Sequence, residues 1–514
     1  MVLDYLILVA FALLMVGIAL YTKKSTGSVN DFLLAGKKGL NGWMTAFSYG
    51  TTYFSAVVFI GYAGQFGRTL GLASIWIGVG NAIFGTLIAW LVLAKRTKNM
   101  TRRLEAKTMP DFFFKRYGDT KLKYFSAIVI FIFLIPYSAS VYSGISSLFE
   151  MVLGIPGWLI MIALAVLTAV YLSFGGYIAT SISDFIQGIV MIVGVICMMI
   201  CFMSNENISW NISELVNNPN LTWFTFGSEN SGGIYGTTVS LIALIILTSF
   251  GVWALPQTVH KYYAVRDKKA IKQGMIVSTG FALIIGFVAY FTGALSFFFE
   301  ETKSIPDSLV VPTMIKIAVP AGLCGLIATL ILSASMSTLA SVSLASASVI
   351  SVDLYKGGIN KNATDKRVNT LMKLLSFSFV ILSVVLALLN DKFNIAAIAY
   401  MMGISWGTLA GCFMGPFVLG LIWKKVTKSA VWTSIVGSLV ITVTLVFVFG
   451  IDKTASGASL SAILKAGIGT SPLIGVICMV YSLISTYLVS LITKKPDDNI
   501  IETAFHKSFE GEIV

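Results

Sequence analysis

The sequence predicts an all-α polytopic membrane protein, because it is apolar, poor in charge and divided into long apolar segments. Of its 514 residues, 56% are hydrophobic and 11% are charged, whereas a soluble chain carries about 25% charged residues. So few charged side chains could not cover the surface of a soluble core of this size. The composition therefore excludes a soluble enzyme, a disordered chain and a disulfide scaffold.

Thirteen apolar segments separated by charged stretches are predicted to be membrane helices, since about 20 apolar residues cross a bilayer. They are 3–21, 43–64, 69–93, 124–149, 156–172, 183–202, 236–259, 274–299, 315–352, 374–389, 395–423, 430–450 and 473–492. The longest polar gap, 203–235, is predicted to be a loop, so we expect no soluble domain.

The basic residues predict the orientation in the membrane. With the N-terminus outside, 30 of the 36 Lys and Arg residues fall on the cytoplasmic side, including five from Lys261 to Lys272, and 6 fall on the outer side. Cytoplasmic loops of membrane proteins are enriched in Lys and Arg. We therefore expect a multi-pass protein of the plasma (inner) membrane with a cytoplasmic C-terminus, and the net charge of +13 does not indicate a nucleic-acid partner.

The segment 43–64 contains a polar interruption. Thr51, Thr52 and Ser55 lie close to Gly50, a composition that suits an unwound turn whose backbone carbonyls face an ion. An ordinary helix, whose hydroxyls bond to carbonyls one turn earlier, fits the same residues.

A second interruption lies in the segment 236–259, where Gly251 and Pro256 flank Trp253. Proline removes a helical hydrogen bond and clashes with the preceding turn, so a simple proline kink is one interpretation. Two interrupted helices spaced five apart are also what a pair of inverted five-helix repeats shows, with the binding site at the breaks.

The segment 315–352 carries hydroxyls at Ser337, Thr338 and Ser341. Small residues of this kind pack helices closely, and their oxygens would serve equally well as ligands for Na⁺. Asp184 stands at the predicted start of 183–202, where it is either a helix N-cap or an ion ligand on a release path.

Catalytic signatures are missing from the sequence. It has no phosphate-binding loop, Cys-x-x-Cys pair, His-Glu-x-x-His or Gly-x-Ser-x-Gly motif. We therefore expect a protein that is not an enzyme, with no metal site besides sodium.

Three motifs together resemble the sodium/solute symporters, which include sodium/proline, pantothenate, sialic acid and glucose cotransporters. They are 175–187 (GGYIATSISDFIQ), Met336-Ser-Thr-Leu339 and Asp353-Leu-Tyr-Lys356, and the resemblance extends from Asp31 to Trp423. It implies an extra N-terminal helix, two inverted five-helix repeats, two C-terminal helices and a cytoplasmic tail, here 1–21, 43–202 with 236–423, 430–492 and 493–514.

The resemblance also implies a main sodium site. It combines backbone carbonyls at the first break, a carbonyl in the segment 315–352 and two hydroxyls of that segment. The matching residues are Thr51, Phe54, Ala334, Ser337 and Thr338.

A second sodium site, or a release path, is implied at Asp184 and Ser341. Ala340 stands where the family pattern has a serine, so we expect one Na⁺ per cycle.

The solute is less defined by the resemblance. The proline branch carries an aspartate in the first break followed by Ser-Gly-Trp, where this sequence has Tyr53 and then Ser55-Ala-Val57. The runs 52–61, 250–258 and 305–312 look more like the pantothenate branch. The residues expected to line the solute pocket are Tyr53, Ser55, Phe59, Trp253 and Pro256.

The sequence thus predicts a sodium-coupled importer of a small organic solute, working by alternating access, with Na⁺, the solute and the bilayer as its partners and a monomer sufficient. The solute would be a carboxylate such as pantothenate or an amino acid such as proline. A proton-coupled or passive transporter and a membrane sensor derived from a transporter are the alternatives. Buried carboxylates and histidines are scarce, which favours Na⁺ over protons.

Overall fold

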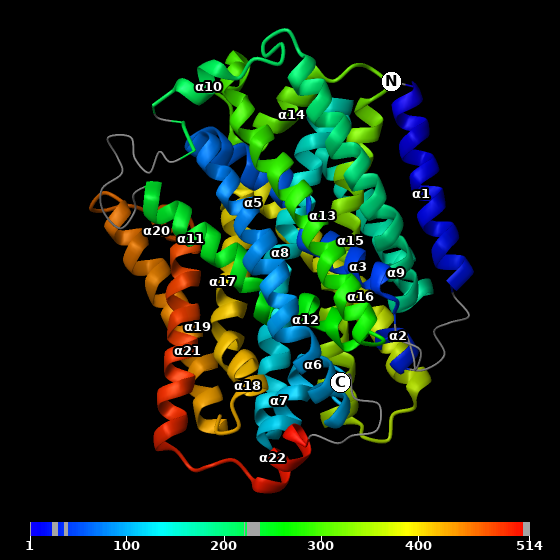
Figure 1. Cartoon of the computed structure of the whole chain (residues 1–514), viewed down its shortest axis with the longest axis vertical. Coiled ribbons are helices and arrows are strands. Elements are labelled where there is room, and N and C mark those ends of the chain that lie inside the picture. The colour runs from blue at the N-terminus through cyan, green and yellow to red at the C-terminus, as the bar shows by residue number, and fades with distance from the viewer. Residues whose placement is uncertain (1, 23–28, 35–39, 220, 224–236, 507–514) are drawn as a thin grey trace.

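Helices lying side by side form the molecule, and most of them follow its long axis (Figure 1). The computed structural model describes residues 2–22, 29–34, 40–219, 221–223 and 237–506. Within these residues, 10 helices are long and apolar enough to cross a membrane, or 11 if one bent pair counts as a span. The all-helical membrane class is therefore confirmed.

The number of membrane helices, thirteen, stays a prediction. Gly157–Leu172 is apolar but shorter than a span, and Val57–Arg103 forms a single helical stretch across the predicted boundary between 43–64 and 69–93. The segment predicted to start at residue 183 starts earlier, because the helix Gly157–Ser204 is interrupted only at Gly176, whose φ of 56° favours glycine.

The first half of the described chain contains α1 (Val2–Thr22), α2 (Val29–Leu34), α3 (Gly42–Tyr53), η2 (Val57–Gly67), α5 (Ile75–Ala82), η4 (Ile83–Ile88), η5 (Trp90–Ala94), α6 (Lys95–Arg103), α7 (Met109–Tyr117), α8 (Thr120–Leu153), α9 (Gly157–Ser204) and α10 (Ser213–Asn217). The second half contains α11 (Thr237–Phe250), η6 (Gly251–Ala254), α12 (Pro256–Tyr263), α13 (Lys268–Ala294), α14 (Asp307–Ala318), α15 (Cys324–Ser348), η9 (Val349–Ile359), α16 (Asp365–Phe393), α17 (Ile398–Met414), α19 (Lys428–Lys453), α20 (Leu460–Ile468), α21 (Ser471–Ile492) and α22 (Asp498–Phe505).

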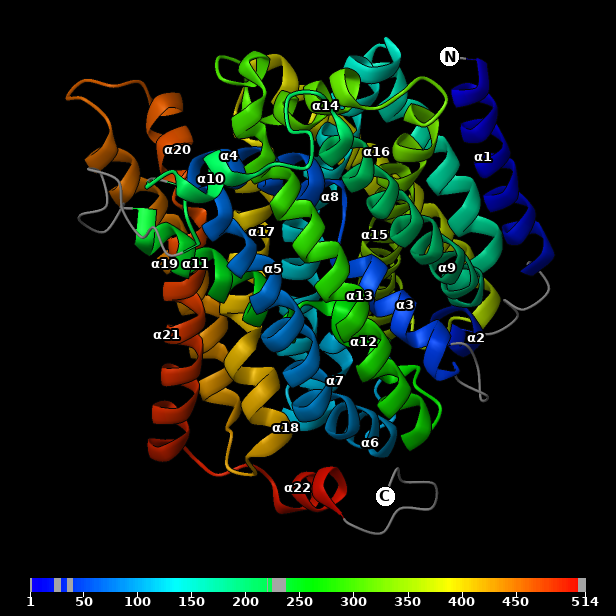
Figure 2. The same ribbon diagram turned by 45° about the horizontal axis from the view of Figure 1, so that its top comes forward.

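The helix α15 lies at the centre and α1 at the edge. The most apolar window of the stretch Cys324–Ile359 is 94% buried, whereas that of α1 is 22% buried. In both views α1 lies on one flank and α19–α21 on the other (Figures 1 and 2). This placement suits the extra terminal helices of the predicted layout, whose division into two five-helix repeats stays a prediction.

The start of α1 and the helix α22 lie at opposite ends of the long axis (Figure 1). Such a placement fits a chain that crosses the membrane an odd number of times. The assignment of the α22 end to the cytoplasm rests on the charge distribution and stays a prediction. Lys23, Lys24, Lys37 and Lys38, which contribute to that distribution, lie outside the described residues.

Glycines allow α13 to approach α5 closely. An ideal Cβ on Gly286 would lie 2.9 Å from the Cα of Gly78, and one on Gly78 would lie 2.6 Å from the carbonyl carbon of Gly286. Backbone contact of this kind is a common source of van der Waals attraction between membrane helices. Side chains larger than hydrogen therefore cannot be placed at either position without moving a helix.

We expect Gly286→Leu to lower the stability by about 1–3 kcal/mol or more, because it overpacks this contact. Gly280→Leu is the matched control, since Gly280 lies on the same helix with open space around its Cβ position. Thermal unfolding of the two purified variants in detergent measures the difference. Equal melting temperatures would contradict the close contact between α5 and α13.

Candidate functional site

The first predicted break is present at the end of α3. Phe54 is extended (φ −104°, ψ 114°), and its N–H donates to the carbonyl of Gly50 at 3.2 Å. The side chain of Ser55 then accepts a hydrogen bond from the N–H of Val57 at 3.3 Å, at the start of η2. Carbonyls in the last turn of α3 consequently lack helical partners.

The second predicted break separates α11 from α12. Leu255 is extended and Pro256 occupies the first turn of α12, where its missing N–H costs nothing. The axes on the two sides of the break differ by 47°. The Tyr53 hydroxyl donates to the carbonyl of Thr248 in α11 at 2.7 Å, so the two interrupted helices contact each other near their breaks.

The hydroxyls of α15 reach the freed carbonyls of α3. Ser337 Oγ lies 2.9 Å from the carbonyl oxygen of Thr51 and 3.1 Å from that of Ala334. Thr338 Oγ1 lies 3.4 Å from the carbonyl oxygen of Thr52. Four of the five residues predicted for the main sodium site, Thr51, Ala334, Ser337 and Thr338, therefore meet in this buried place, and the fifth, Phe54, is the buried residue at the break itself.

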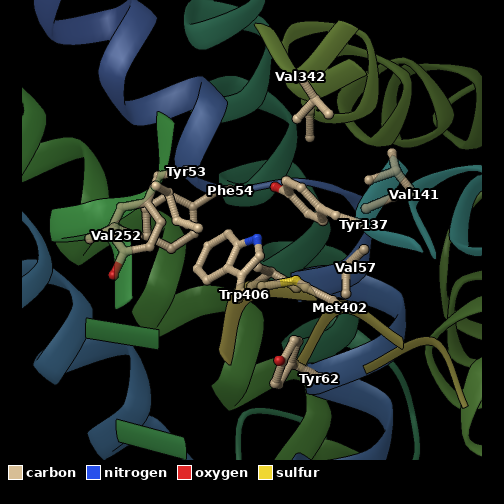
Figure 3. Close-up of a cluster of buried hydrophobic side chains, with 14 of the residues drawn as sticks. Tyr53, Phe54, Val57, Tyr62, Tyr137, Val141, Val252, Val342, Met402 and Trp406 are labelled. Atoms are coloured by element: carbon tan, nitrogen blue, oxygen red, sulfur yellow. The ribbon is translucent and has the colours of Figure 1, made fainter. Parts of the chain in front are cut away.

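Aromatic side chains fill the space beside the first break (Figure 3). Trp406 of α17 lies between Tyr53 and Tyr137 of α8, with ring centroids 6.3 Å and 5.4 Å apart. The Tyr137 hydroxyl lies near the hydroxyls of Ser55 and Thr338 without forming a hydrogen bond of ordinary geometry. Within the described chain the Trp406 Nε1 is also buried without a hydrogen-bond partner. The Tyr137 hydroxyl and the Trp406 N–H are therefore two buried donors without an acceptor among the described residues.

Sequence reasoning missed Tyr137 and Trp406, although both lie beside features that break helical regularity. Tyr137 follows Pro136, and Trp406 precedes Gly407 in a segment rich in small residues. An aromatic residue beside Pro or Gly inside a membrane helix is the signal that could have indicated them.

Four of the five residues predicted to line the solute pocket are buried at or near the breaks, namely Tyr53, Ser55, Phe59 and Pro256. The structure does not bring Trp253 into this group. Its partly exposed indole donates to the carbonyl of Phe84 at 2.9 Å, and its ring lies tilted against that of Phe250 with centroids 5.4 Å apart.

Asp184 lies inside a helix, eight residues beyond the interruption at Gly176. The first of the two interpretations from the sequence, a helix N-cap, is therefore wrong. Its Oδ2 accepts a hydrogen bond from Ser48 at 2.5 Å and lies 3.5 Å from Lys261 Nζ. The charge distribution predicts Lys261 in a cytoplasmic loop, which is wrong, because α12 continues to Tyr263 and this side chain is only 2% exposed. Ser341, predicted beside Asp184, lies 2.9 Å from the same ammonium.

A second buried charge cluster explains the motif that begins at Asp353. Lys123 Nζ lies 2.9 Å from Asp111 Oδ1 and 3.4 Å from Asp353 Oδ1. Thr108 donates to the other Asp353 oxygen at 2.7 Å. The cluster joins α7, α8 and η9 at the end of the molecule that carries α22.

Comparison with known proteins identifies the family of this chain. The family model described as the sodium:solute symporter family matches residues 32–437. The chain belongs to this family. The Osmoregulated proline transporter OpuE of Bacillus subtilis is 26% identical over 495 residues (94% of this chain, 93% of that protein). A sodium/proline symporter of Staphylococcus aureus is 26% identical over 518 residues (98% and 95%).

Solved structures share the fold. An outward-open, substrate-bound Na⁺-coupled sialic acid symporter has a TM-score of 0.75 at 18% identity, covering 96% of this chain and 99% of that one. A manganese transporter of Eremococcus coleocola has a TM-score of 0.53 at 13% identity, covering 90% and 99%. The named relatives are proline transporters, so the expected nearness to the pantothenate branch is unsupported. Three short runs carry less information than similarity along the whole chain.

We expect Lys123→Met to destabilise the protein by about 3–5 kcal/mol, because it leaves the buried carboxylate of Asp353 without a cation and leaves Asp111 only its ion pair with Lys115 at 3.4 Å. Lys121→Met is the matched control on the same helix, since Lys121 is exposed. Thermal unfolding in detergent again gives the comparison. A Lys123→Met protein as stable as the control would show that the cluster contributes no net stability.

Proposed function

We propose that this symporter imports a small organic solute together with Na⁺, which binds between α3 and α15. The observation that carries the proposal is the contact of the Ser337 and Thr338 hydroxyls with the carbonyls of Thr51 and Thr52. A membrane helix tolerates such freed carbonyls only where other groups satisfy them. Oxygens from two helices converge here with no formal charge among them, which suits a monovalent hard cation.

In the proposed bound state, Na⁺ takes ligands from the carbonyls of Thr51, Phe54 and Ala334 and from the hydroxyls of Ser337 and Thr338. The hydroxyls that now donate to the carbonyls would rotate and offer lone pairs to the ion. Na⁺ would thus replace direct hydrogen bonds by a stronger link between the broken helix and α15. Occupancy would fix the shape of the break and of anything that binds beside it.

The solute would bind on the other side of the break, among the aromatic side chains of Figure 3. The Tyr137 hydroxyl and the Trp406 Nε1 are both potential donors that are buried without partners in the described part of the chain. An unpaired buried donor costs about 1–3 kcal/mol, which a solute with acceptor oxygens would recover. A carboxylate such as pantothenate, or an amino acid such as proline, has that chemistry.

Alternating access follows from the link between the two sites. Na⁺ from outside would close α3 against α15 and complete the solute pocket, and loss of Na⁺ to a low-sodium cytoplasm would release the solute. The inward movement of one positive charge gains about 2.3 kcal/mol per 100 mV of membrane potential. This direction of transport assumes that the α22 end is cytoplasmic, as the basic residues predict.

The variant that removes both hydroxyls, Ser337→Ala with Thr338→Ala, is expected to abolish sodium-stimulated uptake. Ser335→Ala is the matched control, because Ser335 donates within its own helix to the carbonyl of Ile331 at 2.7 Å. Uptake of radiolabelled proline and of radiolabelled pantothenate into proteoliposomes, with an inward Na⁺ gradient or with choline, gives the measurement.

Unchanged uptake and unchanged sodium dependence in the double variant would contradict the proposed ion site. Uptake driven by a pH gradient without sodium would instead establish a proton-coupled transporter.

A further inference from the structure

Lys261 places its ammonium group in the centre of the helix bundle. Its ammonium lies 2.8 Å from Ser48 Oγ of α3, 2.9 Å from Ser341 Oγ of α15 and 3.5 Å from Asp184 Oδ2 of α9. Each of its three protons therefore faces an oxygen. Lys261 itself lies on α12, so a single cation connects four helices, including both of the interrupted ones.

The groups around the Lys261 ammonium stabilise a positive charge. Asp184 is fully buried and Lys261 nearly so, and the Tyr177 ring centroid lies 5.3 Å from the ammonium. A buried charge pays a large desolvation cost unless an opposite charge and hydrogen bonds compensate it. Here the carboxylate supplies the opposite charge, two hydroxyls supply hydrogen-bond acceptors, and the ring adds a cation–π contact.

We propose that the Lys261 ammonium is a built-in cation that occupies the place of a second sodium ion, so that the symporter binds one Na⁺ per cycle. The proposal rests on the proposed function, because it concerns the number of coupling ions. Asp184 and Ser341, which the family resemblance implies as ligands of the second ion, instead hold the lysine in this chain.

Sodium would be excluded from the surroundings of Asp184 by the charge of Lys261, and not by a shortage of oxygen ligands. Asp184 Oδ1 is buried with no hydrogen-bond partner among the described residues, so the carboxylate keeps coordination capacity. The pair of Asp184 and Lys261 is already neutral. A sodium ion bound beside it would add an uncompensated charge and would repel the ammonium at close range in a medium of low dielectric constant.

The same ammonium is connected to the main ion site through hydroxyls. Ser341 Oγ, which contacts Lys261, is also 2.9 Å from Thr52 Oγ1, and the Thr52 carbonyl accepts from Thr338. A cation that is covalently tethered cannot leave with the solute. It would hold the helices together as an ion does while contributing nothing to the sodium gradient that drives transport.

Counting bound sodium tests the proposal without knowledge of the solute. The probe is ²²Na⁺ alone, measured by equilibrium binding to the purified full-length protein in detergent with choline as the replacing cation. Lys261→Met retains the stem up to Cε and vacates the position of Nζ. The double variant Lys261→Met with Asp184→Asn removes both charges. Lys98→Met is the matched control, because Lys98 of α6 donates to the carbonyl of Tyr263 at the end of α12, away from Asp184.

We expect one sodium ion per wild-type protein, two for Lys261→Met, and one each for the double variant and for Lys98→Met. Two ions on the wild-type protein would overturn the proposal but leave sodium coupling intact. One ion on a monodisperse Lys261→Met protein would overturn it as well. If Lys261→Met cannot be purified, the wild-type protein still gives a test: one bound sodium ion supports the proposal, and two overturn it. A wild-type protein that binds no sodium would contradict the proposed function itself.

Discussion

The interruption of α3 at Phe54 is the constraint on which the rest of the site depends. A helix that stops inside a membrane leaves carbonyls that water cannot reach, and each one must find a partner within the protein. The hydroxyls of Ser337 and Thr338 on α15 provide those partners. Because the span that contains α15 is the most deeply buried of the candidate spans, these carbonyls meet the two hydroxyls at the centre of the molecule.

At two places in this interior, buried carboxylates are paired with a lysine. Asp184 is paired with Lys261, and Lys123 lies between Asp111 and Asp353. The proposed sodium site between α3 and α15 carries no formal charge, so a cation there would meet no fixed positive charge within the site. In the proposed arrangement, a chain with 11% charged residues places an uncharged sodium site near a carboxylate that a lysine already neutralises.

Several features could be predicted from the sequence because their causes are local. Pro256 lacks an N–H, so a break before it is expected from its position inside an apolar run, where it starts a new helix. The hydroxyls of Ser337 and Thr338 are neighbours in one apolar segment, so the sequence alone places two oxygens at the same depth of one helix. Other features depend on tertiary packing. The burial of Lys261 depends on where α12 ends, and the roles of Tyr137 and Trp406 depend on the meeting of α8 with α17. Spacing along the chain carries no information on such meetings.

A structure determined in sodium chloride and again in choline chloride tests the central claim most directly. The account predicts density for one ion between the backbone oxygens at the end of α3 and the hydroxyls of Ser337 and Thr338, present only with sodium, while the Lys261 ammonium stays on Asp184. A continuous α3 without the interruption, or an ion bound at Asp184 with Lys261 displaced, would contradict it.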